Sequence, residues 1–259
     1  MSSARTEQHW HISQKNDEGF SAETDPDTIA KEAVNSMKNA GLAFTYNEPV
    51  IWFEFMRDTA IKIKEKGLYT VMVSNGFVNR DPLNEIIGFI DAFNIDLKAF
   101  NESFYKKLTG AELEPVKDSL RQIAKAGKHL EITSLIIPGR NDSIDEMEAE
   151  SKWISDELGN ETPFHLSRYF PMYKRNDPPT PEGTLERLFE TASVNLKYVY
   201  MGNTPGDNGQ NTHCSGCGKV VTKRTGYNTN LMNLDRAGRC TGCGNQVYRY
   251  FILPSCADR

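Results

Sequence analysis

The 259-residue sequence contains no cysteine before position 214, so any chemistry carried by its first 213 residues uses no thiolate of their own. It has no apolar run near the roughly 18 residues that a membrane-spanning helix needs, and its N-terminus lacks the basic and then apolar order of a secretory signal. Lysine and arginine total 30 against 35 acidic residues, without a basic run of five. These absences predict a cytoplasmic protein that neither spans a membrane nor binds nucleic acid.

A hydrophobic content of 38% is enough for a core in a chain of this length. Its apolar residues alternate between helical and strand periods. We expect helices over residues 25–41, 51–67, 82–90, 113–127, 143–158 and 181–192, and strands over residues 42–46, 68–74, 92–100, 128–138, 163–170 and 196–202. Strands separated by helices form βαβ units, so the predicted fold class is α/β with a parallel sheet, either doubly wound or a barrel.

All five cysteines lie in the last 46 residues, and four of them form two C-x-G-C-G pairs, HCSGCGK and RCTGCGN. Two such turns place four sulfurs around one tetrahedral metal ion, which predicts a structural zinc site made by Cys214, Cys217, Cys240 and Cys243. Rubredoxin-like iron, or two disulfides, are the alternatives. We expect residues 207–259 to form this ribbon and a tail with a free Cys256, after an α/β domain over residues 1–206.

Polar residues follow the predicted strands, at the edge where parallel sheets bind ligands. Each has a structural explanation when taken alone: Glu48 begins a helix, Ser-Asn-Gly at 74–76 is a turn, Asp96 and Lys98 form a salt pair, and His165 is a core histidine. Taken as a set they predict a pocket for a zwitterionic, ribose-bearing small molecule. The set is Asn47, Glu48, Asn75, Asp96, Lys98, Thr133 and His165.

Six segments follow one another in order: TYNEPVIWFEF, VSNGFV, FNIDLKAFNESFYKKLTGA, EITSLIIPGRNDS, FHLSRYFPMYKRNDPPTP and KYVYMGNTPGD. Together they resemble radical SAM proteins of the branch that includes pyruvate formate-lyase activating enzymes. More narrowly, they resemble the radical SAM enzyme of the AmmeMemoRadiSam system, which also ends in a cysteine ribbon.

The resemblance implies a partial (β/α) barrel that binds S-adenosylmethionine (SAM) and a [4Fe–4S] cluster, and that cleaves SAM reductively to a 5′-deoxyadenosyl radical. It also implies a role for each polar residue after a strand. Asn47 and Glu48 match family positions near the methionine amino group, and Asn75 matches a position beside the cofactor. Asp96 and Lys98 match the pair near the methionine end of SAM. Thr133 and His165 match positions beside its ribose and adenine.

The resemblance breaks near the N-terminus. The family holds its cluster with C-x-x-x-C-x-x-C after the first strand, and here EQHWHISQ fits the run that follows, with Glu7 in place of the last cysteine. We therefore expect the first strand and the cysteine triad to be absent from this chain, which alone would be inactive. His9 and His11 do not substitute for three thiolates.

Two roles stay open. The chain is a radical SAM protein whose cluster-binding segment is supplied elsewhere or lost, or it is a non-catalytic, degenerate barrel that binds a partner through its zinc ribbon. A nucleic-acid-binding ribbon is disfavoured because Lys223 and Arg224 are a small basic footprint. A missing first strand would leave the strand at 42–46 as an open sheet edge, which predicts a partner chain, a missing segment or self-association covering it.

Overall fold

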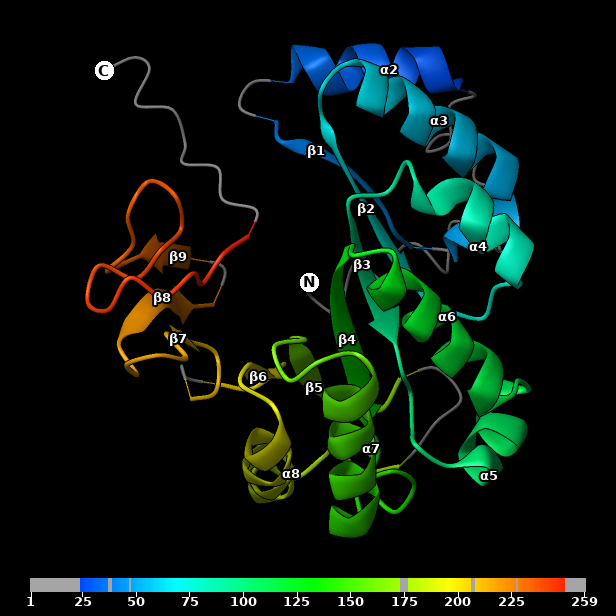
Figure 1. The fold of residues 1–259 in the computed structure, drawn as a ribbon. Helices are drawn as coiled ribbons and strands as arrows, with labels where there is room; N and C mark the ends of the chain where they lie inside the picture. The colour runs from blue at the N-terminus through cyan, green and yellow to red at the C-terminus, as the bar shows by residue number, and fades with distance from the viewer. Residues whose placement is uncertain are drawn as a thin grey trace.

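The computed structural model describes residues 24–36, 39–46, 48–172, 177–205, 208–226 and 228–249. Six parallel strands form one curved sheet in chain order (Figure 1). They are β1 (Gly41–Phe44), β2 (Tyr69–Ser74), β3 (Ala92–Asp96), β4 (His129–Ile136), β5 (Phe164–Arg168) and β6 (Val199–Gly202). Within the described residues β1 pairs with β2 alone, so it lies at one edge of the sheet.

Helices cover one face of this sheet (Figure 1). They are α2 (Pro26–Asn35), α3 (Phe53–Glu65), α4 (Arg80–Ile87), α5 (Glu102–Phe104), α6 (Leu113–Lys125), α7 (Ile144–Glu157) and α8 (Glu182–Asn195). Side-chain caps fix two of the helix starts, because Asp25 accepts a hydrogen bond from the N–H of Thr28 and Ser143 accepts one from the N–H of Glu146. None of the described helices is long and apolar enough to cross a membrane.

The alternation of residues along each strand gives the sheet two different faces. On β3, Phe93 and Ile95 are each 1% exposed and belong to the main core beneath the helices. Ala92, Asn94 and Asp96 point to the opposite, concave face and are only partly buried. The fold therefore leaves a concave face lined with polar groups, which is where the candidate site lies.

Two expectations about local structure were wrong in detail, and one stretch of helix was not expected. The strand expected over residues 92–100 ends at Asp96, so Lys98 lies in the following connection and not on the same strand face. The helix expected over residues 51–67 is preceded by a single 3-10 turn, Pro49–Trp52, because Glu48 caps it. A short helix, α5, followed by a π-helical turn, Tyr105–Thr109, was not predicted from the sequence.

The C-terminal residues form a separate antiparallel sheet of β7 (Thr212–His213), β8 (Val220–Thr225) and β9 (Asn228–Leu231). Its small core, built from Cys214, Val221 and Cys240, is distinct from the main core. Figure 1 shows this ribbon on the side of the large sheet that the helices leave uncovered. The predicted boundary between residues 206 and 207 lies outside the described residues.

Candidate functional site

Strand register brings several predicted site residues together on the concave face. Asp96 of β3 pairs with Thr133 of β4, Thr133 pairs with His165 of β5, and His165 pairs with Tyr200 of β6. These four residues therefore form one row across four neighbouring strands, although Asp96 and Tyr200 are 104 positions apart along the chain. Tyr200 was not predicted as a site residue.

A carboxylate with two histidines lies next to this row. Glu131, on the same face of β4 as Thr133, accepts hydrogen bonds from Nε2 of His129 at 3.0 Å and from Nε2 of His165 at 2.9 Å. Burial raises the pKa of Glu131, but the two histidine hydrogen bonds outweigh burial and hold the pKa well below its usual range. Glu131 is thus an anion held between two imidazoles. The sequence pattern KHLEITS contained this cluster, since His129, Glu131 and Thr133 alternate along one strand.

Stacking orients the His165 ring. Its centroid lies 5.1 Å from that of Tyr200, with an interplanar angle of 23°. The His165 side chain is 29% exposed, so His165 is hydrogen-bonded and stacked but is not a core histidine.

Asp96 and Lys98 form an ion pair of 2.9 Å between Oδ2 and Nζ, and both side chains are more than a third exposed. Because β3 ends at Asp96, Lys98 reaches back to the carboxylate from the connection. The Lys98 backbone is held on both sides: its N–H donates to the hydroxyl of Tyr105 and its carbonyl accepts from Nδ2 of Asn141. Tyr105 and Asn141 thus position the pair, and sequence reasoning missed both.

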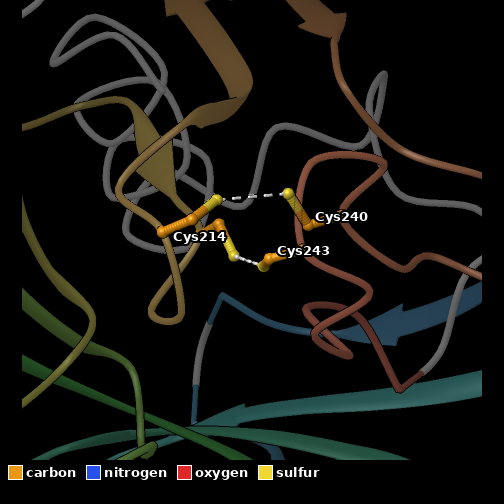
Figure 2. A group of neighbouring side chains, drawn as sticks. Cys214, Cys240 and Cys243 are labelled. Atoms are coloured by element: carbon orange, nitrogen blue, oxygen red, sulfur yellow. Dashed lines mark hydrogen bonds between the residues drawn. The ribbon is translucent and has the colours of Figure 1, made fainter.

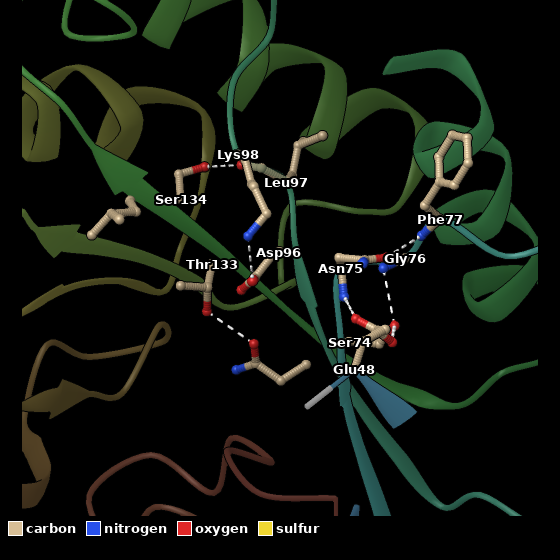
Figure 3. Close-up of polar contacts among 12 residues, drawn as sticks. Glu48, Ser74, Asn75, Gly76, Phe77, Asp96, Leu97, Lys98, Thr133 and Ser134 are labelled. Carbon is tan, nitrogen blue, oxygen red and sulfur yellow. Dashed lines mark hydrogen bonds and ion pairs between the residues drawn. The ribbon is translucent and has the colours of Figure 1, made fainter. Parts of the chain in front are cut away.

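Glu48 joins the ends of β1 and β2. Its Oε1 accepts a hydrogen bond from Oγ of Ser74 at 2.6 Å, and its Oε2 accepts one from the N–H of Asn75 at 2.8 Å. Figure 3 shows these residues together, with Asp96, Lys98 and Thr133 on the neighbouring strands. The Oδ1 of Asn75 accepts from the N–H of Phe77, so the expected turn is present as well. Asn47 lies outside the described residues.

A cavity of about 1380 Å³ occupies the concave face. Thr133 and His165 line it, whereas Glu48, Asn75, Asp96 and Lys98 do not. The predicted residues therefore fall into two groups, one at the ends of β2 and β3 and one inside the cavity. Thr133 belongs to both groups, because it pairs with Asp96 across the strands and lines the cavity.

The four predicted metal ligands converge at one point of the ribbon. The sulfurs of Cys214, Cys217, Cys240 and Cys243 all lie within 4.8 Å of one another. Across the two turns, the Sγ atoms of Cys214 and Cys243 are 3.5 Å apart, and those of Cys217 and Cys240 are 3.6 Å apart (Figure 2). This arrangement can hold a tetrahedral metal ion, and all four ligand positions are filled by protein.

The two cysteine turns have the same backbone geometry. In the first, Gly218 has a φ of 73° and its N–H donates to the carbonyl of Cys214. In the second, Gly244 has a φ of 76° and its N–H donates to the carbonyl of Cys240. Both glycines adopt the left-handed conformation, which a residue without a Cβ reaches at little steric cost. Burial raises the pKa of the Cys214 thiol, but the N–H groups of Gly216 and Cys217 outweigh it and lower that pKa to about 6.

Residues 7–150 match the radical SAM superfamily. The chain is also 42% identical to "Uncharacterized protein MJ0808" of Methanocaldococcus jannaschii, over 93% of this chain and 72% of that protein. The chain therefore belongs to the radical SAM superfamily.

Its relatives place it near the activating enzymes. It is 26% identical to pyruvate formate-lyase 1-activating enzyme of Escherichia coli over 52% of this chain and 55% of that enzyme. The chain thus spans about half the length of this activating enzyme. A solved domain of a pyruvate-formate lyase-activating enzyme from Bacteroides vulgatus superposes with a TM-score of 0.56 at 17% identity, covering 63% of this chain and 99% of that chain, which shows a shared fold.

Proposed function

We propose that this chain is a SAM-binding protein of the activating-enzyme branch, of the type found in the AmmeMemoRadiSam system. SAM would be held by Asn47, Glu48, Asn75, Asp96, Lys98, Thr133 and His165, of which the last two lie within β4 and β5. The cross-strand row of Asp96, Thr133 and His165 is the observation that carries the proposal, because it gathers residues from three strands at one height of the sheet.

The chemistry of these side chains suits SAM. The ammonium of Lys98 complements a methionine carboxylate, and the partly exposed carboxylate of Asp96 complements an ammonium group. The hydroxyl of Thr133 and the ring of His165 can exchange hydrogen bonds with ribose hydroxyls or adenine nitrogens. Glu48 accepts hydrogen bonds from Ser74, Asn75 and the N–H of Val50, so about one of its four acceptor positions remains for a further hydrogen bond.

The residues present do not fit a [4Fe–4S] cluster. Such a cluster is held by cysteine thiolates, and the first cysteine of the sequence is Cys214 in the ribbon. The described groups at the strand ends offer oxygen and nitrogen atoms only. We therefore propose that these 259 residues supply the SAM pocket and not the cluster ligands, so that SAM cleavage requires thiolates from a segment supplied separately.

A second candidate is a non-catalytic binding protein that uses its ribbon as a scaffold. The contacts between the ribbon and the large sheet favour this role, because they hold the ribbon in one position. The Tyr198 hydroxyl donates to Oγ of Ser215, and the hydroxyls of Tyr200 and Thr212 lie 3.0 Å apart. SAM binding separates the two candidates, and metal analysis after anaerobic iron–sulfide reconstitution tests the absence of cluster ligands that both share. One zinc without iron supports a chain that holds no cluster by itself, and about four irons with deoxyadenosine release would contradict this.

Calorimetric titration with SAM tests the proposed pocket. We expect saturable binding by the parent chain and at least tenfold weaker binding by Asp96→Ala, because Lys98 loses its partner and the ligand loses an acceptor. Asp81→Ala, an exposed aspartate in the first turn of α4, is the matched control and should bind as the parent does. No binding by the parent, or equal binding by Asp96→Ala, would overturn the proposal.

A further inference from the structure

The cavity on the concave face has a second wall that belongs to the ribbon. Besides His165 and Tyr200 of the sheet, its lining includes Thr212, Arg224 and Tyr248. The hydroxyls of Thr222 and Tyr248 are hydrogen-bonded to each other, which fixes this wall internally. The cavity is therefore a space between two structural units.

Besides Arg249, the ribbon wall contains Arg224 of β8. Its guanidinium carbon lies 5.4 Å from the ring centroid of Tyr200, in a cation–π contact. Its Nη1 donates to the carbonyl of Gln210 at 2.9 Å and to Oγ1 of Thr212 at 2.8 Å. These contacts hold the guanidinium in place but use only one of its three nitrogens.

No carboxylate pairs with Arg224 among the residues that the structure describes. The acidic groups that line the cavity already have cationic or imidazole partners. Glu131 lies between its two histidines, Asp91 pairs with Lys64 at 2.7 Å, and Glu161 pairs with Lys197 at 3.0 Å. Among the described residues, these pairs leave Arg224 as a partly buried cation without a carboxylate partner. A preorganised guanidinium of this kind favours a carboxylate or phosphate, which accepts two parallel hydrogen bonds from its fork.

We propose that the cavity binds a small anionic molecule whose carboxylate or phosphate group is held by Arg224 of the ribbon. The body of the ligand lies against the edges of the His165 and Tyr200 rings, which stack on each other and line the cavity. Because His165 belongs both to the cavity and to the row proposed for SAM, the ligand would be the substrate of the SAM-dependent reaction. That last assignment rests on the proposed function, whereas the anion site itself does not.

The experiment is a titration of the full zinc-loaded chain with two probes, inorganic phosphate and succinate, followed by NMR. The observed signal is the Nε–Hε resonance of arginines, and the Arg224 peak is identified by its loss in Arg224→Gln. We expect one probe to shift that peak saturably at millimolar concentration. The probe that binds more tightly identifies the acidic group as a phosphate or a carboxylate.

Arg224→Gln should weaken binding at least tenfold, measured from the remaining cavity resonances. Arg236→Gln changes an exposed ribbon arginine outside the cavity lining and should leave the affinity within twofold of the parent. Zinc content and the circular dichroism spectrum show whether each variant is folded. If Arg224→Gln loses zinc, Arg224→Lys takes its place as the test variant. It keeps the positive charge but lacks the planar guanidinium, and it is expected to weaken anion binding at least threefold.

Two results would overturn the anion site: no saturable shift with either probe, or parent-like affinity in the folded Arg224 variants. SAM titration of the same samples separates this inference from the proposed function. SAM binding without anion binding overturns the anion site alone. Anion binding without SAM binding supports the anion site and overturns the proposed function.

Discussion

Glu48 and Ser74 share a hydrogen bond of 2.6 Å that joins the ends of the first two strands of the sheet. The second oxygen of Glu48 receives the N–H of Asn75, so one carboxylate fixes the chain at the end of β2. The residue predicted to meet a ligand ammonium thus also builds the turn that carries Asn75. Structural and functional explanations of Glu48 are compatible, since a carboxylate has about four acceptor positions.

Glu48→Ala should lower the free energy of unfolding by about 1–3 kcal/mol, because the Ser74 hydroxyl and the Asn75 N–H lose their acceptor. Urea denaturation followed by fluorescence measures this loss. Glu54→Ala, an exposed glutamate on α3, is the control and should change stability by less than about 0.5 kcal/mol. Equal stability of the two variants would show that the carboxylate does not hold the strand ends together.

The turn after β2 also requires a glycine. Gly76 has a φ of +70°, and a Cβ there would lie 2.6 Å from Cγ2 of Ile95 and 3.2 Å from Cγ1 of Val116. Gly76→Ala should therefore destabilise the fold by about 1–3 kcal/mol through backbone strain and overpacking. Gly88→Ala is the matched control, because Gly88 has a helical φ of −65° and no atom within 4 Å of the added carbon. Equal urea midpoints for the two variants would contradict this account.

The elements of the fold could be predicted because their patterns are local. Alternation along KHLEITSLIIP gave a strand, and the structure has β4 there (His129–Ile136). Boundaries were less predictable where tertiary contacts decide them. The end of β3 at Asp96 depends on Tyr105 and Asn141, which hold the next residues in a different path and lie 9 and 45 positions away along the chain. No local pattern contains that information.

The candidate site was predicted in its residue types but not in its grouping. Asp96, Thr133 and His165 were selected by the rule that parallel strands present ligands at their carboxyl ends, but only Asp96 ends its strand, whereas Thr133 lies within β4 and His165 is the second residue of β5. The cavity and its ribbon wall depend on how two units pack, which strand periodicity does not encode. Arg224 was therefore considered only as part of a nucleic-acid footprint, and its position over Tyr200 became visible in the structure alone.

The cysteine group predicts a specific response to substitution. Cys217→Ser should bind zinc at least tenfold more weakly in competition with a chromogenic chelator, because one of four converging thiolates is lost. The main core contains no residue of the ribbon's own small core, so the large sheet should stay folded. Cys256→Ser replaces the fifth cysteine and is the control, with one zinc per chain expected. Parent-like zinc affinity in Cys217→Ser would refute the four-cysteine site.

Glu150 of α7 predicts a pH dependence of stability. Its side chain is buried, and Oε1 lies 2.8 Å from Oγ of Ser134, whose hydroxyl also bonds the carbonyl of Leu97. The Ser134 hydroxyl has one proton, so a protonated Glu150 can donate to Ser134 while Ser134 donates to Leu97. Burial, with a smaller contribution from the negative charge of Glu146, raises the pKa of Glu150 to about 8. This chain of hydrogen bonds ends at Leu97, which lies between Asp96 and Lys98, the two residues of the ion pair.

A pKa that is higher in the folded state than its ordinary value of 4.5 means that folding favours the protonated form. The contribution is complete below about pH 4.5 and is lost as the pH rises to about 8, because only the unfolded chain releases the proton in that window. Urea unfolding between pH 5 and pH 9 should show a loss of a few kcal/mol in the parent relative to Glu150→Gln. Glu148→Gln, exposed on the same helix, should keep the parental pH dependence. A constant difference between the parent and Glu150→Gln over this range would mean that Glu150 is ionised in the folded protein.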